Sequence, residues 1–352
     1  MLAHLPFLLF TVLTVYPSLF HMKQAIHKIG VVTSGGDVPG LNAAIRAITR
    51  MGTSLGVEII GVQRGYAGLI DGDFTPLTNR SVSGVLQQGG TILGTARCKQ
   101  FETDEGRRLA ARNLADAEID ALIVIGGNGS LRGAMELHKL GVPLIGVPKT
   151  IDNDQFGTDM AIGVDTALNT IVEAVSRIKD TASSHHRAFL VETMGRGCGY
   201  LALVSAITSG AEMALIPEYP DSLEDVAASI FDSYRLGKKH CIIMVAEGWK
   251  PGVQALKTFL HEHDASEQES GYDVREVILG HVQRGGSPTP FDRLLATRLG
   301  AKAIELLVAG KGNGTMVGLQ GSQIKTISLQ EATSNERVLD PELIKLAKVL
   351  AL

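Results

Sequence analysis

The densest group of charged side chains follows the apolar run PLIGV and occupies residues 148–154, with the sequence PKTIDND. Asp152 and Asp154 are two positions apart, and Lys149 lies three residues before the first of them. Placing charged side chains beside the end of a buried strand costs free energy, so a functional role is the expected reason for them. One carboxylate can accept a proton from a substrate hydroxyl, and the other can hold a metal ion or orient a partner. A solvated acidic turn is the alternative interpretation.

Two glycine-rich segments also follow apolar runs. The sequence TSGGDVPGLN at residues 33–42 and the sequence GGNGS at residues 126–130 both lead into helix-like stretches. Glycine lets backbone N–H groups approach an anion, and a helix N-terminus adds partial positive charge. Together the two segments favour a site that holds one polyphosphate. Neither has Walker A or G-x-G-x-x-G spacing, so tight strand-to-helix turns are the alternative.

Two arginines stand next to glycines after further strand-like runs: Arg196 in MGRGCG and Arg284 in HVQRGG. Arginine in this setting suits bidentate capture of phosphate. The chain as a whole has 33 Lys and Arg against 37 Asp and Glu, a formal charge of −4, so no nucleic-acid partner is expected. The basic groups indicate a small phosphorylated substrate, and the whole set of residues favours phosphoryl transfer.

Short apolar runs that alternate with helix-like stretches must position these residues, and 352 residues are enough for two domains. Continuous apolar runs are typical of parallel strands buried on both faces, and their alternation with helices predicts a doubly wound α/β fold. In such sheets ligands bind at the carboxyl ends of the strands, where the glycine-rich segments fall. The predicted strands are Ile29–Thr33, Val57–Val62, Ala121–Ile125, Pro143–Val147, Ala188–Val191, Met213–Ile216 and Cys241–Ala246.

Residues 1–21 are apolar but lack both the positively charged region and the cleavage site of a signal peptide. Met22 opens a natural first strand, so we interpret residues 1–21 as a spurious or dispensable extension, with a membrane anchor or a signal peptide as alternatives. The rest of the chain has no long apolar run, and its cysteines fit a reducing compartment. A cytoplasmic protein without stable membrane association is expected. The cysteines are Cys98, Cys198 and Cys241.

The order of the motifs SGGDVPGLN, GGNGS, PKTIDND, MGR, VAEG and GHVQRGG resembles that of the bacterial 6-phosphofructokinases, from about Lys28 to about Gly318. The resemblance implies an α/β protein of two doubly wound domains of the phosphofructokinase type, with mostly parallel sheets. It also implies a homotetramer whose active sites are shared between subunits. The implied division is an N-terminal extension at 1–21, a larger phosphoryl-donor domain at 22–163 and 283–335, a smaller sugar-phosphate domain at 164–282, and a C-terminal tail at 336–352.

The resemblance implies transfer of the γ-phosphoryl group of ATP to the 1-hydroxyl of fructose 6-phosphate, with Asp152 as the base. The implied catalytic residues are Asp152, Thr150, Arg196 and Gly36. The implied donor-binding residues are Gly36, Arg97, Cys98, Gly127, Asn128, Gly129, Ser130 and Lys149. The implied sugar-phosphate ligands are Thr150, Ile151, Asp152, Arg187, Met194, Gly195, Arg196, Glu247, Arg275, His281, Val282, Gln283 and Arg284, of which Arg187 and Arg275 would reach in from a neighbouring subunit.

The resemblance also implies a magnesium ion held by Asp154 and by Asn128, which stands where the family has an aspartate. A neutral amide oxygen binds a hard cation more weakly than a carboxylate does, so weaker metal binding is expected. The effector site of the bacterial enzymes is matched only in part, and activation by ADP and inhibition by phosphoenolpyruvate are expected to be weakened or absent. The matching effector residues are Arg46, Arg50, Glu212, Lys238 and Lys239, while Lys179 replaces an arginine and Asn79 and Leu236 stand where basic residues are expected.

Two positions bear on the phosphoryl donor. Lys149 stands where ATP-using members commonly carry glycine, and a lysine there is typical of pyrophosphate-using members and of a mixed ATP-using subgroup. Gly129 leaves open the space that pyrophosphate users tend to fill with a bulky acid. ATP is favoured because a nucleotide needs that space. The alternatives are a pyrophosphate-dependent enzyme, a catalytically weak regulatory or binding subunit suggested by Asn128, and a nucleotide kinase of the NAD-kinase type, which shares only a glycine-rich loop.

Overall fold

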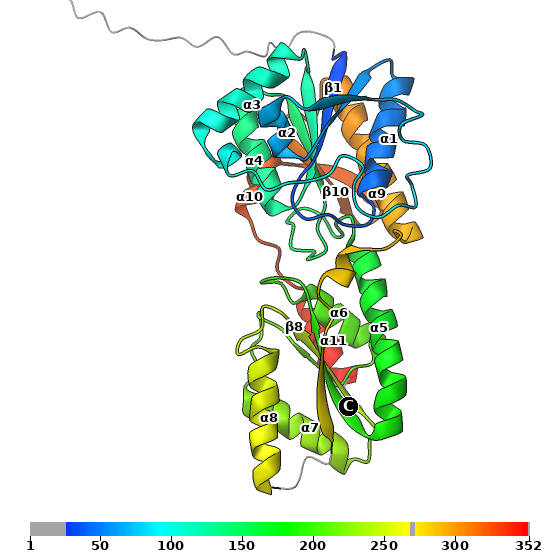
Figure 1. Cartoon of the computed structure of the whole chain (residues 1–352), viewed down its shortest axis with the longest axis vertical. Coiled ribbons are helices and arrows are strands. Elements are labelled where there is room, and N and C mark those ends of the chain that lie inside the picture. The colour runs from blue at the N-terminus through cyan, green and yellow to red at the C-terminus, as the bar shows by residue number, and fades with distance from the viewer. Residues whose placement is uncertain (1–25, 268–271, 351–352) are drawn as a thin grey trace, which may run out of the picture.

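The structure, a computed structural model, describes residues 26–267 and 272–350. The extension predicted at residues 1–21 lies outside these residues. The described chain forms two α/β units stacked along the long axis of the molecule, each built around its own sheet (Figure 1). In the part of the chain that is described, no helix is both long and apolar enough to span a membrane.

The larger unit is built on a seven-stranded sheet with the order β11-β10-β5-β4-β1-β2-β3. All neighbouring pairs are parallel except the two at the edges, β2–β3 and β10–β11. The central strand β4 is buried along its whole length, which confirms the interpretation of its apolar run. The strands are β1 (Lys28–Thr33), β2 (Glu58–Val62), β3 (Phe74–Leu77), β4 (Ala121–Gly126), β5 (Leu144–Pro148), β10 (Thr315–Gln320) and β11 (Gln323–Ser328).

Helices cover both faces of this sheet, as a doubly wound fold requires. One apolar core joins the sheet to α1 (Leu41–Ser54) and α9 (Pro290–Val308), and a second core lies on the opposite face. The elements on that second face are α2 (Tyr66–Asp71), the 3-10 helix η1 (Gln100–Glu102), α3 (Asp104–Asp116), α4 (Asn128–Lys139) and α10 (Leu329–Ser334).

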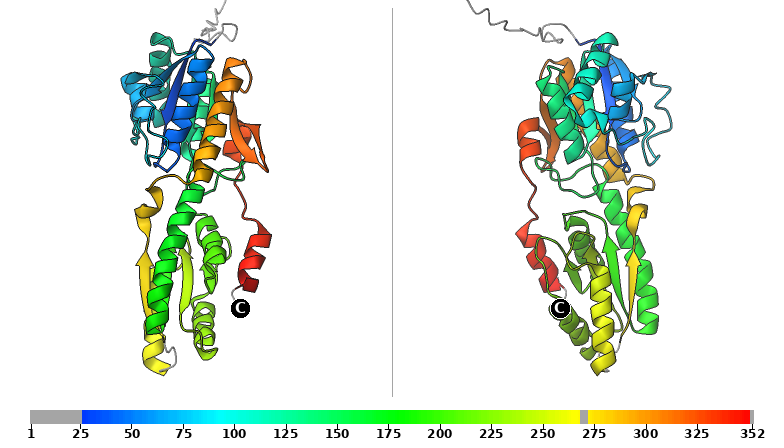
Figure 2. Two further views of the ribbon diagram at one scale, coloured as in Figure 1. Left: turned by 90° about the vertical axis from the view of Figure 1, so that its right-hand side faces the viewer. Right: turned by 60° about the vertical axis from the view of Figure 1, so that its left-hand side comes forward.

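The smaller unit has a four-stranded, fully parallel sheet with the order β7-β8-β6-β9. Its strands are β6 (Arg187–Thr193), β7 (Met213–Leu215), β8 (Cys241–Ala246) and β9 (Asp273–Ile278), and the 3-10 helix η2 (Gly280–Arg284) follows β9. Helices α5 (Val164–His185) and α6 (Tyr200–Ser209) pack on one face, and α7 (Leu223–Arg235) and α8 (Val253–Glu267) on the other. The segment expected to be a tail contains α11 (Pro341–Leu350), which packs against α6 (Figure 2).

A buried carboxylate ties the two units together where α5 leaves the larger one. Asp292 of α9 is fully buried, and its oxygens accept hydrogen bonds from the backbone N–H groups of Gly163 and Thr166 at 2.9 and 2.8 Å. The Thr166 hydroxyl adds a third bond at 2.6 Å. These bonds satisfy donors at the start of α5 that have no partner within the helix. Asp292 therefore fixes the direction in which the chain enters the smaller unit.

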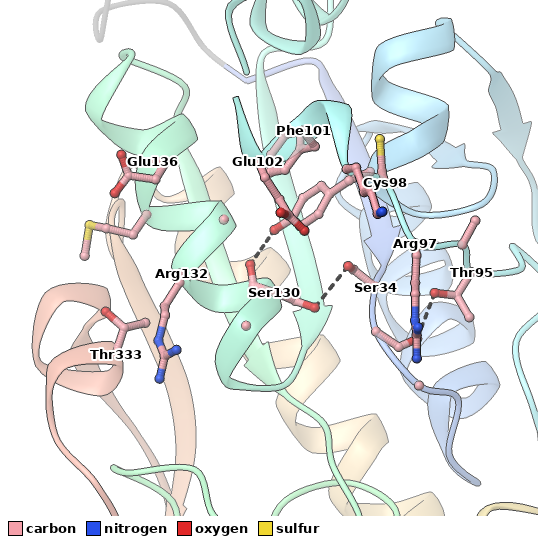
Figure 3. A pocket seen from close by; sticks show the side chains of 18 of the residues that line it. Ser34, Thr95, Arg97, Cys98, Phe101, Glu102, Ser130, Arg132, Glu136 and Thr333 are labelled. Atoms are coloured by element: carbon pink, nitrogen blue, oxygen red, sulfur yellow. Dashed lines mark hydrogen bonds between the residues drawn. The ribbon is translucent and has the colours of Figure 1, made fainter. Parts of the chain in front are cut away.

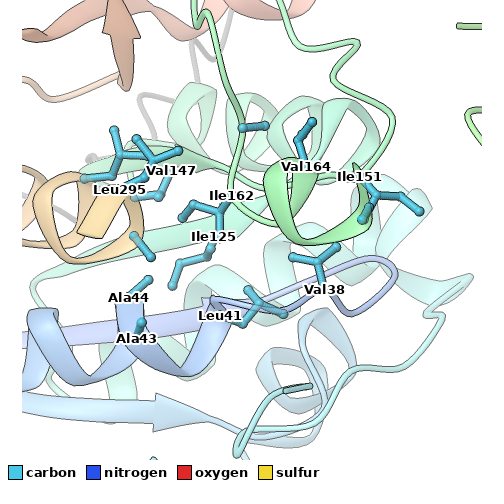
Figure 4. Close-up of a cluster of buried hydrophobic side chains, with 14 of the residues drawn as sticks. Val38, Leu41, Ala43, Ala44, Ile125, Val147, Ile151, Ile162, Val164 and Leu295 are labelled. Carbon is cyan, nitrogen blue, oxygen red and sulfur yellow. The ribbon is translucent and has the colours of Figure 1, made fainter. Parts of the chain in front are cut away.

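The core beneath the carboxyl ends of the strands is continuous with the segment that carries the acidic pair. Ile151 is fully buried and belongs to the same apolar cluster as Val38, Ile162 and Val164 (Figure 4). Because Ile151 is anchored in the core, Thr150 and Asp152 on either side of it are held in place. Packing, and not a local hydrogen-bond pattern alone, therefore positions the charged segment 150–154.

Candidate active site

A cavity of about 1330 Å³ opens at the carboxyl ends of β1 and β4, where the strand order reverses. This is the place at which a doubly wound sheet binds ligands. Its walls come from both units: the glycine-rich loops, residues 95–102 and α4 from the larger one, and the segments after β6 and β9 from the smaller one. Figure 3 shows the walls that the larger unit contributes. Residues from the smaller unit that reach this cavity are Met194, Arg196, His281 and Arg284.

The two glycine-rich loops meet at this cavity, as the sequence predicts. The Ser130 hydroxyl donates a hydrogen bond of 3.0 Å to the Ser34 hydroxyl, which joins the second loop to the first. Thr95 donates a bond of 2.8 Å to the carbonyl of Gly35. Arg97 and Cys98 line the same wall (Figure 3). The predicted donor residues Gly36, Arg97, Cys98, Gly129 and Ser130 are therefore brought together around one space.

An aromatic pair forms a wall that the sequence analysis missed. The rings of Tyr66 and Phe101 stack with their centroids 3.9 Å apart, and both residues line the cavity. The Tyr66 hydroxyl donates a hydrogen bond to the carbonyl of Ser130, and burial raises the pKa of this phenol. No local pattern marks the pair, because the two residues come from α2 and η1, 35 positions apart, and meet only in the fold.

Asp152 is a buried carboxylate beside the cavity and, like Lys149, is not among the residues that line it. The residue is 4% exposed, and its Oδ1 has no hydrogen-bond partner among the described residues. Its backbone N–H donates to the Thr150 hydroxyl at 3.0 Å, and its Oδ2 lies 3.7 Å from Nε of Arg196. Burial and the neighbouring Asp154 raise the pKa of Asp152, while the charge of Arg196 opposes this shift. A poorly solvated carboxylate with a free oxygen is suited to accept a proton.

Asp154, the second carboxylate of the predicted pair, lies beside the glycine loop. The Asn128 amide donates a hydrogen bond of 2.9 Å from Nδ2 to Oδ2 of Asp154. Among the residues described, no three His, Cys, Asp or Glu side chains gather as a metal cage. Magnesium in phosphoryl-transfer sites commonly takes one or two carboxylates, phosphate oxygens and water. One carboxylate with an adjacent amide oxygen fits that pattern, so Asp154 and Asn128 could hold the ion.

Lys149, predicted as a donor ligand, lies beneath the first glycine loop and does not belong to the cavity wall. The residue is 3% exposed. Its ammonium donates hydrogen bonds to the carbonyls of Ser34 at 2.9 Å and Gly36 at 2.5 Å. Burial, and after it the charge of Arg284, lowers the pKa of Lys149 to about 7.

The predicted sugar-phosphate residues of the smaller unit surround the turn after β6. Glu247, directly after β8, accepts hydrogen bonds from the N–H groups of Gly195 at 3.2 Å and Arg196 at 2.7 Å. The fully buried Gln283 accepts a bond of 3.2 Å from the Met194 N–H. Glu247 and Gln283 therefore shape the backbone that carries Arg196. Val282 in contrast is 62% exposed.

Arg187 and Arg275 are not brought to this cavity within one chain. Both pair with Asp273, Arg187 through Nε at 3.1 Å and Arg275 through Nη2 at 2.7 Å. Arg187 begins β6, whereas the turn that carries Arg196 follows its end, which places the two about 20 Å apart along the strand. Their contribution to a neighbour's site stays a prediction.

The predicted effector residues fall into two separate groups. Arg46 and Arg50 lie on α1 of the larger unit. The others lie in the smaller unit, where the Lys179 ammonium donates to the carbonyls of Ser209 and Gly210 at the end of α6. Glu212 accepts a bond of 2.7 Å from the Ile242 N–H, and its other oxygen is 3.7 Å from Nζ of Lys238.

Comparison with known proteins gives a consistent answer over most of the chain. The model of the family described as Phosphofructokinase matches residues 28–307. The ATP-dependent 6-phosphofructokinase of Halothermothrix orenii is 48% identical over 92% of this chain and 99% of that protein. The ATP-dependent 6-phosphofructokinase 1 of Thermus thermophilus is 49% identical with the same two coverages, 92% and 99%.

Solved structures support the same fold. Phosphofructokinase from Saccharomyces cerevisiae superposes with a TM-score of 0.81 at 37% identity over 87% of this chain, which spans 45% of the yeast chain. The pyrophosphate-dependent phosphofructokinase of Marinobacter aquaeolei superposes with a TM-score of 0.79 at 20% identity, over 93% of this chain and 92% of that one, and shows the fold alone. The doubly wound α/β fold predicted from the sequence is thus confirmed, and the chain belongs to the phosphofructokinase family, among its bacterial members.

Proposed function

We propose that this protein is an ATP-dependent 6-phosphofructokinase, which converts fructose 6-phosphate and ATP into fructose 1,6-bisphosphate and ADP. The observation that carries the proposal is Asp152: a buried carboxylate with one unpaired oxygen, 3.7 Å from the guanidinium of Arg196. Its segment is joined to the second glycine loop by the bond between Asp154 and Asn128. The relatives at 48% and 49% identity are ATP-dependent 6-phosphofructokinases, which supports the same activity.

In the proposed reaction Asp152 takes the proton of the sugar 1-hydroxyl. The alkoxide oxygen bonds to the γ-phosphorus, the bond from that phosphorus to the bridging oxygen breaks, and ADP leaves. Arg196 lies beside the base and Arg97 on the donor wall, so both can face charge that develops during the transfer. Arg284 reaches the cavity from the smaller unit and is proposed to bind the sugar's phosphate.

The space at Gly129 favours ATP over pyrophosphate. A Cβ placed on Gly129 would meet no atom within 4 Å, so the α-phosphate and nucleoside have room to extend past the glycine loop. Beyond it the cavity continues along α4 to the aromatic pair Tyr66 and Phe101. A pyrophosphate user needs none of this volume.

Magnesium is the proposed cofactor, with Asp154 and Asn128 as the residues that would hold it. When bound, a divalent ion neutralises charge on the donor's phosphates. The protein itself supplies one carboxylate, because Asn128 contributes a neutral amide. A homotetramer with shared sites and a cytoplasmic location are further proposals, and the mass of the native protein in solution tests the first.

A donor assay on the purified protein tests the proposal. Fructose 6-phosphate with magnesium is offered together with ATP or with pyrophosphate, and fructose 1,6-bisphosphate is measured. Turnover with ATP supports the proposal, and turnover with pyrophosphate alone supports the alternative donor. If the protein binds fructose 6-phosphate but turns it over with neither donor, it is a binding subunit and the proposed activity is wrong. The single tryptophan, Trp249, lies two residues after Glu247 and offers a fluorescence signal for sugar binding.

A further inference from the structure

The side chain of Lys149 occupies a slot between the end of β5 and the first glycine loop. It is 3% exposed and donates to the carbonyls of Ser34 and Gly36 at 2.9 and 2.5 Å. Ser34, Gly35, Gly36 and Asp37 all line the cavity, whereas Lys149 does not. The lysine therefore holds the loop from behind, on the side away from the space where a donor would bind.

The direction of these bonds determines where the loop's N–H groups point. In a trans peptide unit the C=O of one residue and the N–H of the next point in opposite directions. Since the carbonyls of Ser34 and Gly36 point inward at Lys149, the N–H groups of Gly35 and Asp37 point away from it. Within residues 26–267 and 272–350, neither N–H donates to a backbone carbonyl. Two free donors on a glycine loop form a site for an anion.

We propose that Lys149 is a positioning residue for the phosphoryl donor: by binding the carbonyls of Ser34 and Gly36 it turns the N–H groups of Gly35 and Asp37 toward the donor's phosphates. This identification of the ligand rests on the proposed function, whereas the orientation of the loop does not. The lysine acts through the backbone and does not touch the donor itself. A direct electrostatic contact with the donor is the competing explanation for a lysine at this position.

The charges around Lys149 separate these two explanations. The groups that face it are Asp37 on the loop, Asp152 after β5, Arg196 after β6 and Arg284 in η2. Burial and Arg284 lower the pKa of Lys149 to about 7, so much of the amine loses its charge in mildly alkaline solution. A neutral amine still donates two hydrogen bonds, so positioning survives deprotonation. A direct attraction to phosphate would be lost.

The first measurement is amide hydrogen exchange of the full-length protein without donor, by mass spectrometry. In Lys149→Met the carbonyls of Ser34 and Gly36 lose this partner, which typically costs enough to speed local opening about tenfold. Within residues 33–40 the N–H of Ser34, which is bonded to the carbonyl of Ile125 at 3.1 Å, is expected to exchange faster by that factor, while peptides from α9 are unchanged. Lys302→Met, at a partly exposed lysine of α9, is the matched control and is expected to leave the loop as it is. Unchanged exchange at residues 33–40 in Lys149→Met would overturn the proposal.

The second measurement is the steady-state rate with ATP at pH 6.5 and at pH 8.5. The kcat/KM for ATP is expected to fall about tenfold to a hundredfold in Lys149→Met, because a displaced loop no longer presents its donors. Sugar binding, read from Trp249 fluorescence, is expected to persist. Positioning predicts the same ratio of wild type to variant at both pH values. If the ratio of the wild-type kcat/KM to that of the variant instead falls toward one at pH 8.5, Lys149 acts through a direct charge contact with the donor and the proposal is wrong.

The proposed function and the proposed role of Lys149 can be refuted separately. A wild-type protein without any turnover would refute the proposed function, and the exchange experiment would still decide how the loop is held. Should Lys149→Met not fold, Lys149→Gln keeps a polar end in the slot and serves in the same exchange comparison. Because a glutamine is too short to reach both carbonyls, faster exchange at residues 33–40 is expected there as well.

Discussion

The amide of Asn128 donates a hydrogen bond of 2.9 Å to Oδ2 of Asp154. A second, longer bond of 3.4 Å reaches the carbonyl of Asp154. Asn128 therefore holds in place the carboxylate that we propose as a magnesium ligand. An aspartate at position 128 could not donate these bonds and would place two negative charges side by side. The amide is therefore expected to order Asp154 but to contribute less to metal binding than a carboxylate would.

Asn128→Asp is expected to lower the magnesium concentration at half-maximal activity by about threefold to tenfold, because a second carboxylate adds charge to the site. Without magnesium the same variant is expected to be less stable by about 1 kcal/mol, since two carboxylates then repel each other. Magnesium titrations of activity, together with urea unfolding in chelator and in magnesium, measure both effects. Asn128→Ala is the control and is expected to need more magnesium than the wild type. An unchanged requirement in Asn128→Asp would show that position 128 does not face the ion.

Asp152→Asn is expected to lower kcat by about a hundredfold to ten-thousandfold, the range for loss of a general base. The amide keeps the size of the side chain, so sugar binding read from Trp249 fluorescence is expected to remain. Asp116→Asn, on the exposed surface of α3, is the matched control for loss of an aspartate. Asp152→Asn with the wild-type rate would remove Asp152 from the chemistry.

The arginine beside this base is expected to set the acid side of the pH–rate profile. The base works when ionised, so kcat/KM falls as the pH drops through the pKa of Asp152, which burial and Asp154 raise. The charge of Arg196 opposes that rise. Arg196→Gln is therefore expected to move the acid limb to higher pH, besides lowering kcat about tenfold or more. Arg196→Lys keeps the charge and is expected to leave the limb close to that of the wild type. If kcat/KM falls at the same acidic pH in Arg196→Gln and in Arg196→Lys, the charge of Arg196 does not influence the pKa of Asp152.

The central strands could be predicted from the sequence because their signal is local. The runs Ile29–Thr33, Ala121–Ile125 and Cys241–Ala246 are continuously apolar, since helices bury both faces of these strands. Strands β3, β9, β10 and β11 were not predicted. Of these, β3, β9 and β11 lie at sheet edges, whereas β10 lies inside its sheet. β11 is half exposed and polar, so it lacks an apolar run, and only its pairing with β10 makes it a strand.

A short segment that carries several polar groups can be recognised in the sequence, whereas a contact between distant residues cannot. The segments around Asp152 and Gly129 could be identified from their sequence. The stack of Tyr66 on Phe101 could not, because two isolated aromatic residues in an ordinary sequence carry no local sign that they meet. The bonds of Lys149 to the first glycine loop depend on the direction in which its side chain leaves the end of β5. The sequence of the motif does not reveal that direction.

Gly129→Glu is expected to fold normally yet raise the KM for ATP about tenfold or more. A Cβ at this position meets no atom within 4 Å, so the fold tolerates it, but the longer acidic side chain enters the space proposed for the nucleotide. Gly129→Ala is the matched control, expected to keep the KM for ATP and to stabilise α4 by about 0.5–1 kcal/mol. Steady-state kinetics with ATP and thermal unfolding measure the two effects. A KM for ATP that Gly129→Glu leaves unchanged would place the nucleotide elsewhere.

The stability of the protein is expected to depend on pH through Lys149. Its pKa falls from 10.5 to about 7 in the folded state, chiefly through burial, so between these values the unfolded chain binds a proton that the folded chain does not. Proton linkage then makes the folded state more stable as the pH rises, with a slope of up to about 1.4 kcal/mol per pH unit from this one group.

Lys149→Met has no such proton to lose, so its stability is expected to rise less steeply over the same range. Urea unfolding of both proteins at pH 7, 8 and 9 measures the difference, and the comparison cancels groups that titrate in both. As the pH increases, the free energy of unfolding of the wild type is expected to rise relative to that of the variant. The reason is that burying a charged amine costs free energy, whereas burying a neutral amine costs much less. Parallel pH dependences would mean that the amine keeps its charge in the folded protein, with the carbonyls of Ser34 and Gly36 compensating for its burial.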